Sequence, residues 1–161
     1  NRRVVDFARR EKMLAEMEET QDRISLLEKL VTNWQDGAVK LWLTKTLLEI
    51  RREFLLPILP DVVMKPVIVT GERAEDLIAY TLSSPLSDVK LMVVALRHPH
   101  GLLGDDILRV AEDGWKDTWL EIDGITGDAF DLLLDREISL EEIIAPGKLL
   151  ARFPVAVIRY S

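Results

Sequence analysis

The sequence predicts a mixed α/β or α+β fold, with an N-terminal helical arm followed by a small mixed β-sheet body that carries short helices. Three observations lead to this prediction. Apolar residues from Met13 to Trp34 are spaced alternately four and three residues apart, which is the period of a coiled-coil seam or of one wall of a helical hairpin. Helical spacing resumes directly after Asp36-Gly37. Beyond Pro60, short apolar runs alternate with turn residues, as in the strands of a sheet.

The helical arm is expected to occupy residues 1–58. No proline or glycine interrupts residues 3–34, so we expect one long helix there. Gly37 can adopt the left-handed conformation that ends a helix, and a second stretch of helical spacing follows it at once. Because the connection is short, the expected arrangement is an antiparallel hairpin, with Trp34 and Trp42 facing each other near its tip.

Two apolar stripes on this arm are candidate contact surfaces. Leu14, Leu26 and Leu30 widen the first seam, which favours burial against more than one neighbour. A hairpin can bury only one facing seam, so we expect self-association or docking of a protein partner through the rest. The residues expected to make this contact are Met17, Ile24, Leu27, Val31 and Trp34 in the first helix, and Leu41, Leu48 and Leu55 in the second.

The body is expected to occupy residues 59–161, beyond a boundary marked by Pro57 and Pro60, because a residue before proline avoids helical geometry. Its first expected elements are a strand at 67–69, a helix at 72–83, a strand at 89–96 and a brief helix at 105–112. The first three are compatible with a βαβ unit, which would be right-handed if its strands are parallel.

The second half of the body has hairpin and capping signals. Asp123-Gly124 is a typical hairpin turn, which would pair a strand at 119–122 with one at 130–134. Ser139 and Glu142 have the spacing of a capping box, which predicts one or two helical turns that stop at Pro146-Gly147. Residues 149–160 are expected to form the last strand, with Pro154 placing it at an edge or a bulge.

Composition limits the classes of protein to consider. The 161 residues include no cysteine, which excludes disulfides, thiol catalysis and thiolate metal sites. No apolar run approaches the length of about 18 residues typical of a membrane span, and no signal-peptide pattern is present. We therefore expect a soluble, cytoplasmic protein, although the chain starts at Asn1 without methionine and a preceding segment could be missing.

The net charge of −7 is concentrated in the body. Residues 105–142 contain 13 acidic and 3 basic side chains. Such a surface repels a phosphate backbone, which argues against nucleic-acid binding there. It is suited instead to a basic protein partner.

One loop is a candidate metal site. His98 and His100 are the only histidines, and they follow the apolar strand at 89–96. Together with Asp105 or Asp106 they could supply three ligands to Zn²⁺ or another divalent ion, with one position left for water. Such an ion would support Lewis-acid hydrolysis. The alternative is a polar surface loop in which Asp105 caps a helix.

The sequence thus leads to two functional hypotheses. The first is a non-enzymatic interaction or assembly component that oligomerises, or docks a partner, through its helical arm. The second is a small metal-dependent hydrolase centred on His98 and His100. No other pattern nominates catalytic residues or a cofactor, so the non-enzymatic hypothesis is the one the sequence favours.

Overall fold

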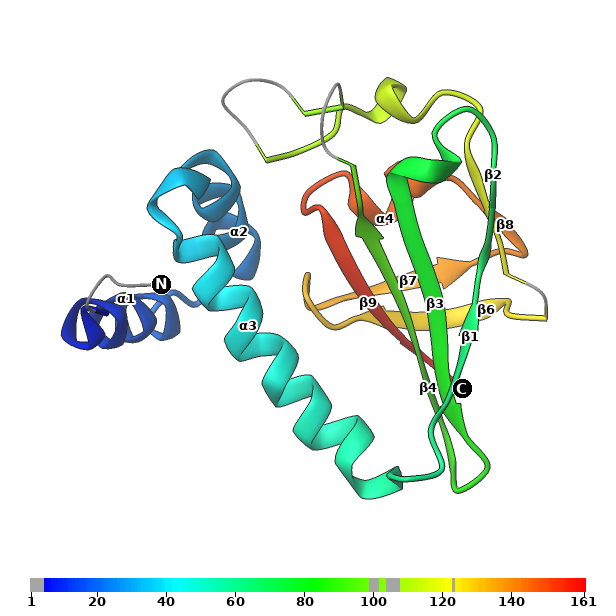
Figure 1. Cartoon of the computed structure of the whole chain (residues 1–161), viewed down its shortest axis with the longest axis horizontal. Helices are drawn as coiled ribbons and strands as arrows, with labels where there is room; N and C mark the ends of the chain where they lie inside the picture. Colours follow the sequence, from blue (N-terminus) through cyan, green and yellow to red (C-terminus); the bar gives the residue numbers. More distant parts are fainter. Residues whose placement is uncertain (1–4, 99–101, 104–107, 123) are drawn as a thin grey trace.

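The computed structural model of the chain describes residues 5–98, 102–103, 108–122 and 124–161. Within these residues, four α-helices and nine β-strands form a helical layer beside a β-sheet body (Figure 1). Every strand pair is antiparallel. The mixed α+β class is therefore confirmed, whereas the parallel βαβ unit considered for the body is wrong.

The helical layer contains three helices, and the fourth lies in the body. They are α1 (Phe7–Glu18), α2 (Arg23–Thr32), α3 (Ala38–Ile50) and α4 (Pro146–Leu150). Shorter helical turns occur at Trp34–Asp36, Arg51–Leu55, Leu56–Ile58, Ala74–Asp76 and Glu112–Trp115. Across the described part of the chain, no helix combines the length and apolar character needed to cross a membrane.

The single helix predicted for residues 3–34 is wrong, because the chain leaves helical geometry between Glu18 and Arg23. Asp22 begins α2, and its side chain accepts a hydrogen bond from the backbone N–H of Ile24. Aspartate is among the strongest N-caps, and it starts a new helix where the seven-residue spacing predicted a continuous one. The predicted stop at Gly37 is confirmed, since this residue has a φ of 83°.

Two antiparallel sheets make up the body. The larger has the order β1-β3-β4-β9-β6-β7, with strands Val63–Pro66, Leu77–Ser84, Ser87–Leu96, Val155–Tyr160, Gly127–Asp131 and Arg136–Leu140 in that order. The smaller has the order β2-β5-β8, with strands Ile68–Thr70, Trp119–Glu121 and Ile143–Ile144. The chain passes from the larger to the smaller sheet between β1 and β2, around Val67.

The helix predicted for residues 72–83 is also wrong, because most of this segment forms β3. The residues that suggested a helical face fit a strand equally well, since Leu77 and Ala79 are buried while Ile78 between them is exposed. β3 lies between β1 and β4, and pairing on both sides satisfies its backbone groups. The strand predicted at 89–96 is confirmed as most of β4.

In the second half of the body, strands form near the predicted positions 119–122, 130–134 and 149–160, but the predicted hairpin, the capping-box helix and the edge position of the last strand are wrong. β5 pairs with β2 and β8, so the chain around Gly124 connects two sheets and does not close a hairpin. Ser139 lies in β7, and the helix that follows starts at Pro146, a residue well suited to a first helical turn. β9 is an interior strand between β4 and β6, and Pro154 precedes its first residue.

Each face of the larger sheet supports a separate hydrophobic core. One lies between the two sheets and α4, and includes Trp115, Leu120, Ile144, Leu149 and Ile158. The other lies between the larger sheet and the helices, and includes Leu27, Val31, Trp42, Phe153 and Val157. The helices therefore contribute to a core that they share with the sheet.

Polar contacts also join the helices to the body. The backbone N–H of Leu108 donates to the carbonyl of Val31 at 3.1 Å. The guanidinium of Arg152 pairs with the carboxylate of Glu28 at 3.0 Å. These contacts fix α2 in place, because they act at both the end and the middle of that helix.

Asp131 is a fully buried carboxylate at the end of β6. Its Oδ1 accepts hydrogen bonds from the backbone N–H groups of Leu133 and Leu134, at 3.0 and 3.1 Å. Its Oδ2 has no partner among the described residues. Burial raises the pKa of Asp131 above its ordinary value, against the opposing effects of the two hydrogen bonds and of Arg136.

We expect Asp131 to lower the stability of the protein as the pH rises from about 4. Because the folded-state pKa is raised, the folded protein binds this proton more tightly than the unfolded chain does, and stability falls between the unfolded pKa and the folded pKa. Asp131→Asn does not titrate, so its free energy of unfolding should increase relative to the wild type over that interval. Urea unfolding at several pH values between roughly 3 and 8 measures the difference, and a constant difference would contradict this expectation.

Gly71 lies where two loops approach closely. Its φ is +102°, and a Cβ at this position would lie 2.3 Å from the carbonyl oxygen of Asp117. Gly37 has a similar φ of +83°, but a Cβ there would meet no atom within 4 Å. We expect Gly37→Ala to cost about 1–2 kcal/mol from backbone conformation alone, and Gly71→Ala to cost about 1–3 kcal/mol more because of the overlap. Equal losses in urea unfolding would show that the two loops can separate freely.

Candidate functional site

The apolar residues predicted to contact a partner are divided between core and surface. Leu27 and Val31 are buried, and Met17, Ile24, Leu41 and Leu55 are half-buried. Only Trp34 and Leu48 are largely exposed. Most of the first seam therefore packs within this chain, and the clearest exposed residue of the second stripe is Leu48.

A groove of about 440 Å³ separates α1 from α3. It is lined by Leu14, Leu41, Thr44, Lys45, Leu48, Glu49 and Arg52. Leucines from both helices form its apolar part, and Leu48 is 57% exposed. The sequence predicted that Leu41 and Leu48 share one side of a helix. It did not predict the opposite wall of the groove, because the position of α1 depends on the break in the helix before α2.

Charged side chains edge this groove. The ammonium of Lys45 lies 2.8 Å from a carboxylate oxygen of Glu49 and 3.2 Å from one of Glu18. The hydrogen bond to Glu49 is the main cause that raises the pKa of Lys45, and Glu18 adds to it. The ion pair with Glu18 also connects α1 to α3, although exposed ion pairs of this kind contribute little stability.

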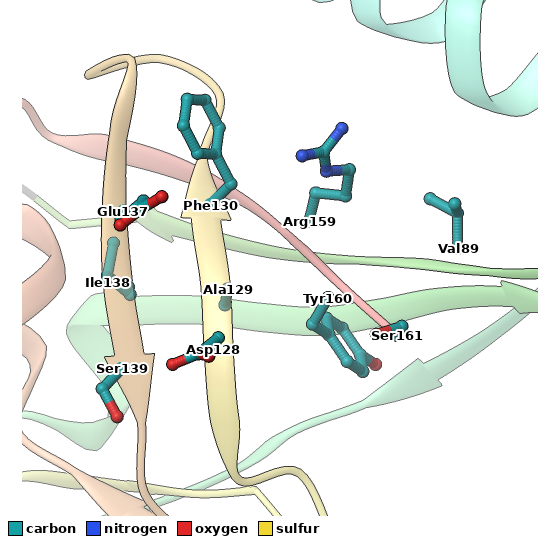
Figure 2. Close-up of a pocket in the computed structure, with 10 residues that line it drawn as sticks. All are labelled: Val89, Asp128, Ala129, Phe130, Glu137, Ile138, Ser139, Arg159, Tyr160 and Ser161. Atoms are coloured by element: carbon teal, nitrogen blue, oxygen red, sulfur yellow. The ribbon is translucent and has the colours of Figure 1, made fainter.

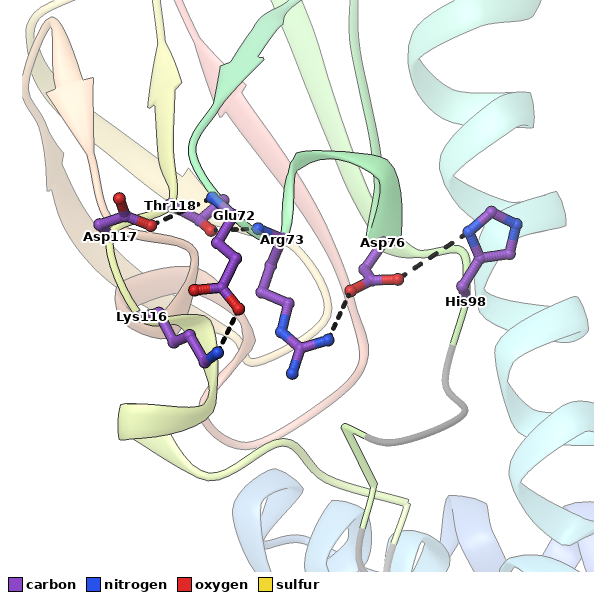
Figure 3. Close-up of polar contacts among 7 residues, drawn as sticks. All are labelled: Glu72, Arg73, Asp76, His98, Lys116, Asp117 and Thr118. Atoms are coloured by element: carbon purple, nitrogen blue, oxygen red, sulfur yellow. Dashed lines mark hydrogen bonds and ion pairs between the residues drawn. The ribbon is translucent and has the colours of Figure 1, made fainter.

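His98, the first residue of the predicted metal site, lies beside an aspartate that sequence reasoning did not select (Figure 3). Its Nδ1 is 3.9 Å from Oδ1 of Asp76, and Arg73 approaches the other carboxylate oxygen at 3.5 Å. The backbone carbonyl of Asp76 also accepts a hydrogen bond from the N–H of Arg97 at 2.7 Å. Asp76 thus holds the end of β4 against the segment before β3.

The same end of the body contains a second set of polar contacts (Figure 3). The backbone N–H groups of Glu72 and Arg73 donate to the side chains of Asp117 and Thr118, at 3.1 and 2.9 Å. Lys116 forms an ion pair with Glu72. These contacts connect the loop after β2 with the chain before β5, which gives the cluster an evident structural role.

Of the residues predicted to bind a metal, His98 is described, and His100, Asp105 and Asp106 lie outside the described residues. Among the described residues, no group of three or more histidines, aspartates and glutamates could hold a metal ion. The carboxylate of Asp76 already faces Arg73, which would compete with a cation for it. The metal site and the hydrolase activity stay predictions. The basic protein partner predicted for the acidic region 105–142 also stays a prediction.

An open trough of about 680 Å³ lies on the larger sheet beyond the helices (Figure 2). Asp128 and Glu137 come from the neighbouring strands β6 and β7, and Ser139 lies opposite Asp128 in the register. The guanidinium of Arg159 lies over the rings of Phe130 and Phe54, at 5.5 and 5.9 Å from their centroids. The sequence did not reveal this trough, because its residues meet only through the unpredicted β6–β7 pairing.

The trough offers charge but little enclosure. Its carboxylates are exposed, and Arg159, the one cationic residue among the described residues that line it, is already stacked on aromatic rings. No nucleophile and base form a hydrogen-bonded pair among the residues that line it.

No protein-family model matches the chain, and no curated protein matches it in sequence.

Asp76 should contribute more to stability than His98. Replacing Asp76 by Ala removes the carboxylate that pairs with Nη1 of Arg73 at 3.5 Å, while the buried Nε of the same guanidinium already has no acceptor among the described residues. We therefore expect a loss of about 1–3 kcal/mol. The side chain of His98 is half-exposed, and its ion-pair contact within the described part of the chain is the 3.9 Å approach to Asp76, so His98→Ala should cost at most about 1 kcal/mol. Thermal or urea unfolding of both variants tests this order, and a larger loss for His98→Ala would reverse it.

Proposed function

We propose that this chain is a non-enzymatic protein–protein interaction module, and that it associates with a second copy of itself through the α1–α3 groove. The observation that carries the proposal is Leu48, which is 57% exposed on the side of α3 that borders this groove. Leu14 and Leu41 extend the apolar surface on both sides. Contiguous exposed apolar surface on a folded domain commonly marks an interaction site.

The charges at the groove permit a second copy as the partner. Lys45 and Arg52 lie there together with Glu49, and Lys45 already pairs with Glu49 within the chain. In a two-fold dimer the same surface meets itself, and this internal ion pair leaves little charge to oppose the contact. α3 carries two lysines and one glutamate, so the net negative charge of the chain does not repel the two copies at this helix.

Hydrophobic burial supplies the driving force. Each leucine that moves from water into a contact gains about 1.5–3 kcal/mol. Leu48 and the exposed parts of Leu14 and Leu41 would contribute from each copy. Part of this gain is lost to the ordering of the two chains, so the expected association is moderate, with dissociation on the order of micromolar.

We expect the wild-type chain to have the mass of a dimer, at tens of micromolar, in size-exclusion chromatography with light scattering. Leu48→Asp should convert it to a monomer, because a dimer would bury two unpaired carboxylates. Ile143→Asp is the matched control, since Ile143 is 58% exposed on β8 of the smaller sheet, away from α3. This variant should remain dimeric.

A monomeric wild type over the same concentration range would overturn self-association. Dimers of equal stability in the wild type and Leu48→Asp would mean that another surface mediates association. Circular dichroism of each variant establishes that the fold is intact before the masses are compared.

A further inference from the structure

On the side of α3 that faces the larger sheet, the helix and the strands do not close completely. Leu43 from α3 and Leu55 from the following turn face Leu82, Val93 and Val155 from three strands, and all five side chains are only half-buried. Nearby positions in the same layer are closed, as at Ile50, Leu91 and Val157, which are buried. The helix and the sheet are therefore in close contact at Ile50, Leu91 and Val157, and their apolar surfaces separate beside these residues.

The divergence leaves a cavity of about 390 Å³. It is lined by Leu43, Leu47, Ile50, Arg51, Leu55, Tyr80, Leu82, Leu91, Val93, Ala95, Val155 and Val157. Its size falls within the range of small-molecule sites, and its wall is mainly apolar with few polar groups, as such sites usually are. The strands that contribute to the wall are β3, β4 and β9 (Figure 1).

The shape favours a slender ligand over a protein surface. Most of the lining side chains are half-buried between two elements of one fold, so a flat or convex partner would not reach them. An alkyl chain can enter such a gap, and each methylene that it buries raises the affinity about three- to fourfold.

The charge at the cavity indicates the head group. Arg51 is the only charged residue in the lining, and its side chain is exposed. None of the ion pairs found among the described residues involves Arg51. A guanidinium can bind a carboxylate through two parallel hydrogen bonds. Tyr80 adds a phenol to the same lining, as a neutral hydrogen-bonding group.

We propose that this cavity binds a single-chain anionic amphiphile of the fatty-acid class. The alkyl chain lies between α3 and strands β3, β4 and β9, and the carboxylate binds Arg51. The site is separate from the α1–α3 groove, because Leu47 and Arg51 line the cavity whereas Leu48 and Arg52 line the groove. The two positions in each pair are adjacent in sequence, which provides matched control variants.

The first experiment tests the head group. Dodecanoate, kept below its micellar concentration, is titrated into the intact chain by isothermal titration calorimetry, and dodecanol is measured by displacement of dansyl-labelled undecanoate. Arg51→Gln should weaken dodecanoate binding about tenfold or more and change dodecanol binding less than about twofold. Arg52→Gln should leave both affinities at the wild-type level. Equal losses for the two arginine variants would overturn the assignment of the carboxylate to Arg51.

The second experiment tests the cavity itself. Leu47→Trp introduces a larger side chain at the mouth, where Leu47 is 36% exposed and the added volume can be accommodated. We expect it to reduce dodecanoate affinity at least about tenfold, by occupying space equivalent to several methylenes. Leu48→Trp makes the same change one residue away, on the groove side, and should bind like the wild type.

A wild type that binds no dodecanoate would overturn the proposal. So would Leu47→Trp and Leu48→Trp variants that bind equally well. Circular dichroism reports whether each variant is folded. If Leu47→Trp is not folded, the comparison of Arg51→Gln with Arg52→Gln decides the outcome, because both arginines are exposed and their replacement removes no buried contact.

Discussion

The packing of α3 on the larger sheet is the constraint on which the rest of the structure depends. Trp42 is buried in this contact and meets the ring of Phe153 edge to face, with centroids 5.5 Å apart. The guanidinium of Arg23 in α2 lies over the indole ring of Trp42, 5.6 Å from its centroid. Because an aromatic residue of this size buries so much apolar surface, the position of Trp42 sets where both α2 and α3 lie.

The buried stripe of α3 accounts for only part of the apolar surface of this helix. The stripe formed by Val39, Trp42, Thr46 and Ile50 takes one side of the helix. Successive residues are about 100° apart around an α-helix, so Leu47 and Leu48 point to different sides. One borders the cavity beside the sheet and the other borders the groove beside α1. The two proposed sites are thus consequences of one helix that is apolar on more sides than its neighbours cover.

The polar clusters of the body differ from these apolar sites in what they can do. Around Asp76 and Glu72, Arg73 pairs with Asp76 within one segment, and Glu72 pairs with Lys116 of a neighbouring loop. The backbone N–H groups of Glu72 and Arg73 donate to side chains of that loop. This arrangement explains how three loops are held at one end of the body, close enough that Gly71 has no room for a side chain. The trough by Asp128 and Glu137 has fewer such contacts but remains open to water, which weakens charge interactions there. A mainly apolar lining is therefore the property that distinguishes the candidate sites on α3.

Features that depend on short-range chemistry could be predicted from the amino-acid sequence. The apolar run of β4, the left-handed Gly37 between helices, the repeat of Leu41 and Leu48, and the change from helices to strands near Pro60 were all readable from local patterns. The apolar part of the proposed interaction surface was predictable for the same reason. A seven-residue spacing predicts which residues share one side of a helix, and this prediction does not depend on what the helix packs against.

Which elements contact one another depends on long-range packing. The spacing of Leu77, Ile78 and Leu82 suits either a helix or a strand, and pairing with β1 and β4 on both sides selected the strand. The partners of β5 and β6 depend on segments distant in sequence, so the Asp123-Gly124 signal could not reveal that they belong to different sheets. The groove, the trough and the cavity have the same origin. Each lies between elements whose contact depends on long-range packing, which local patterns in one sequence do not encode.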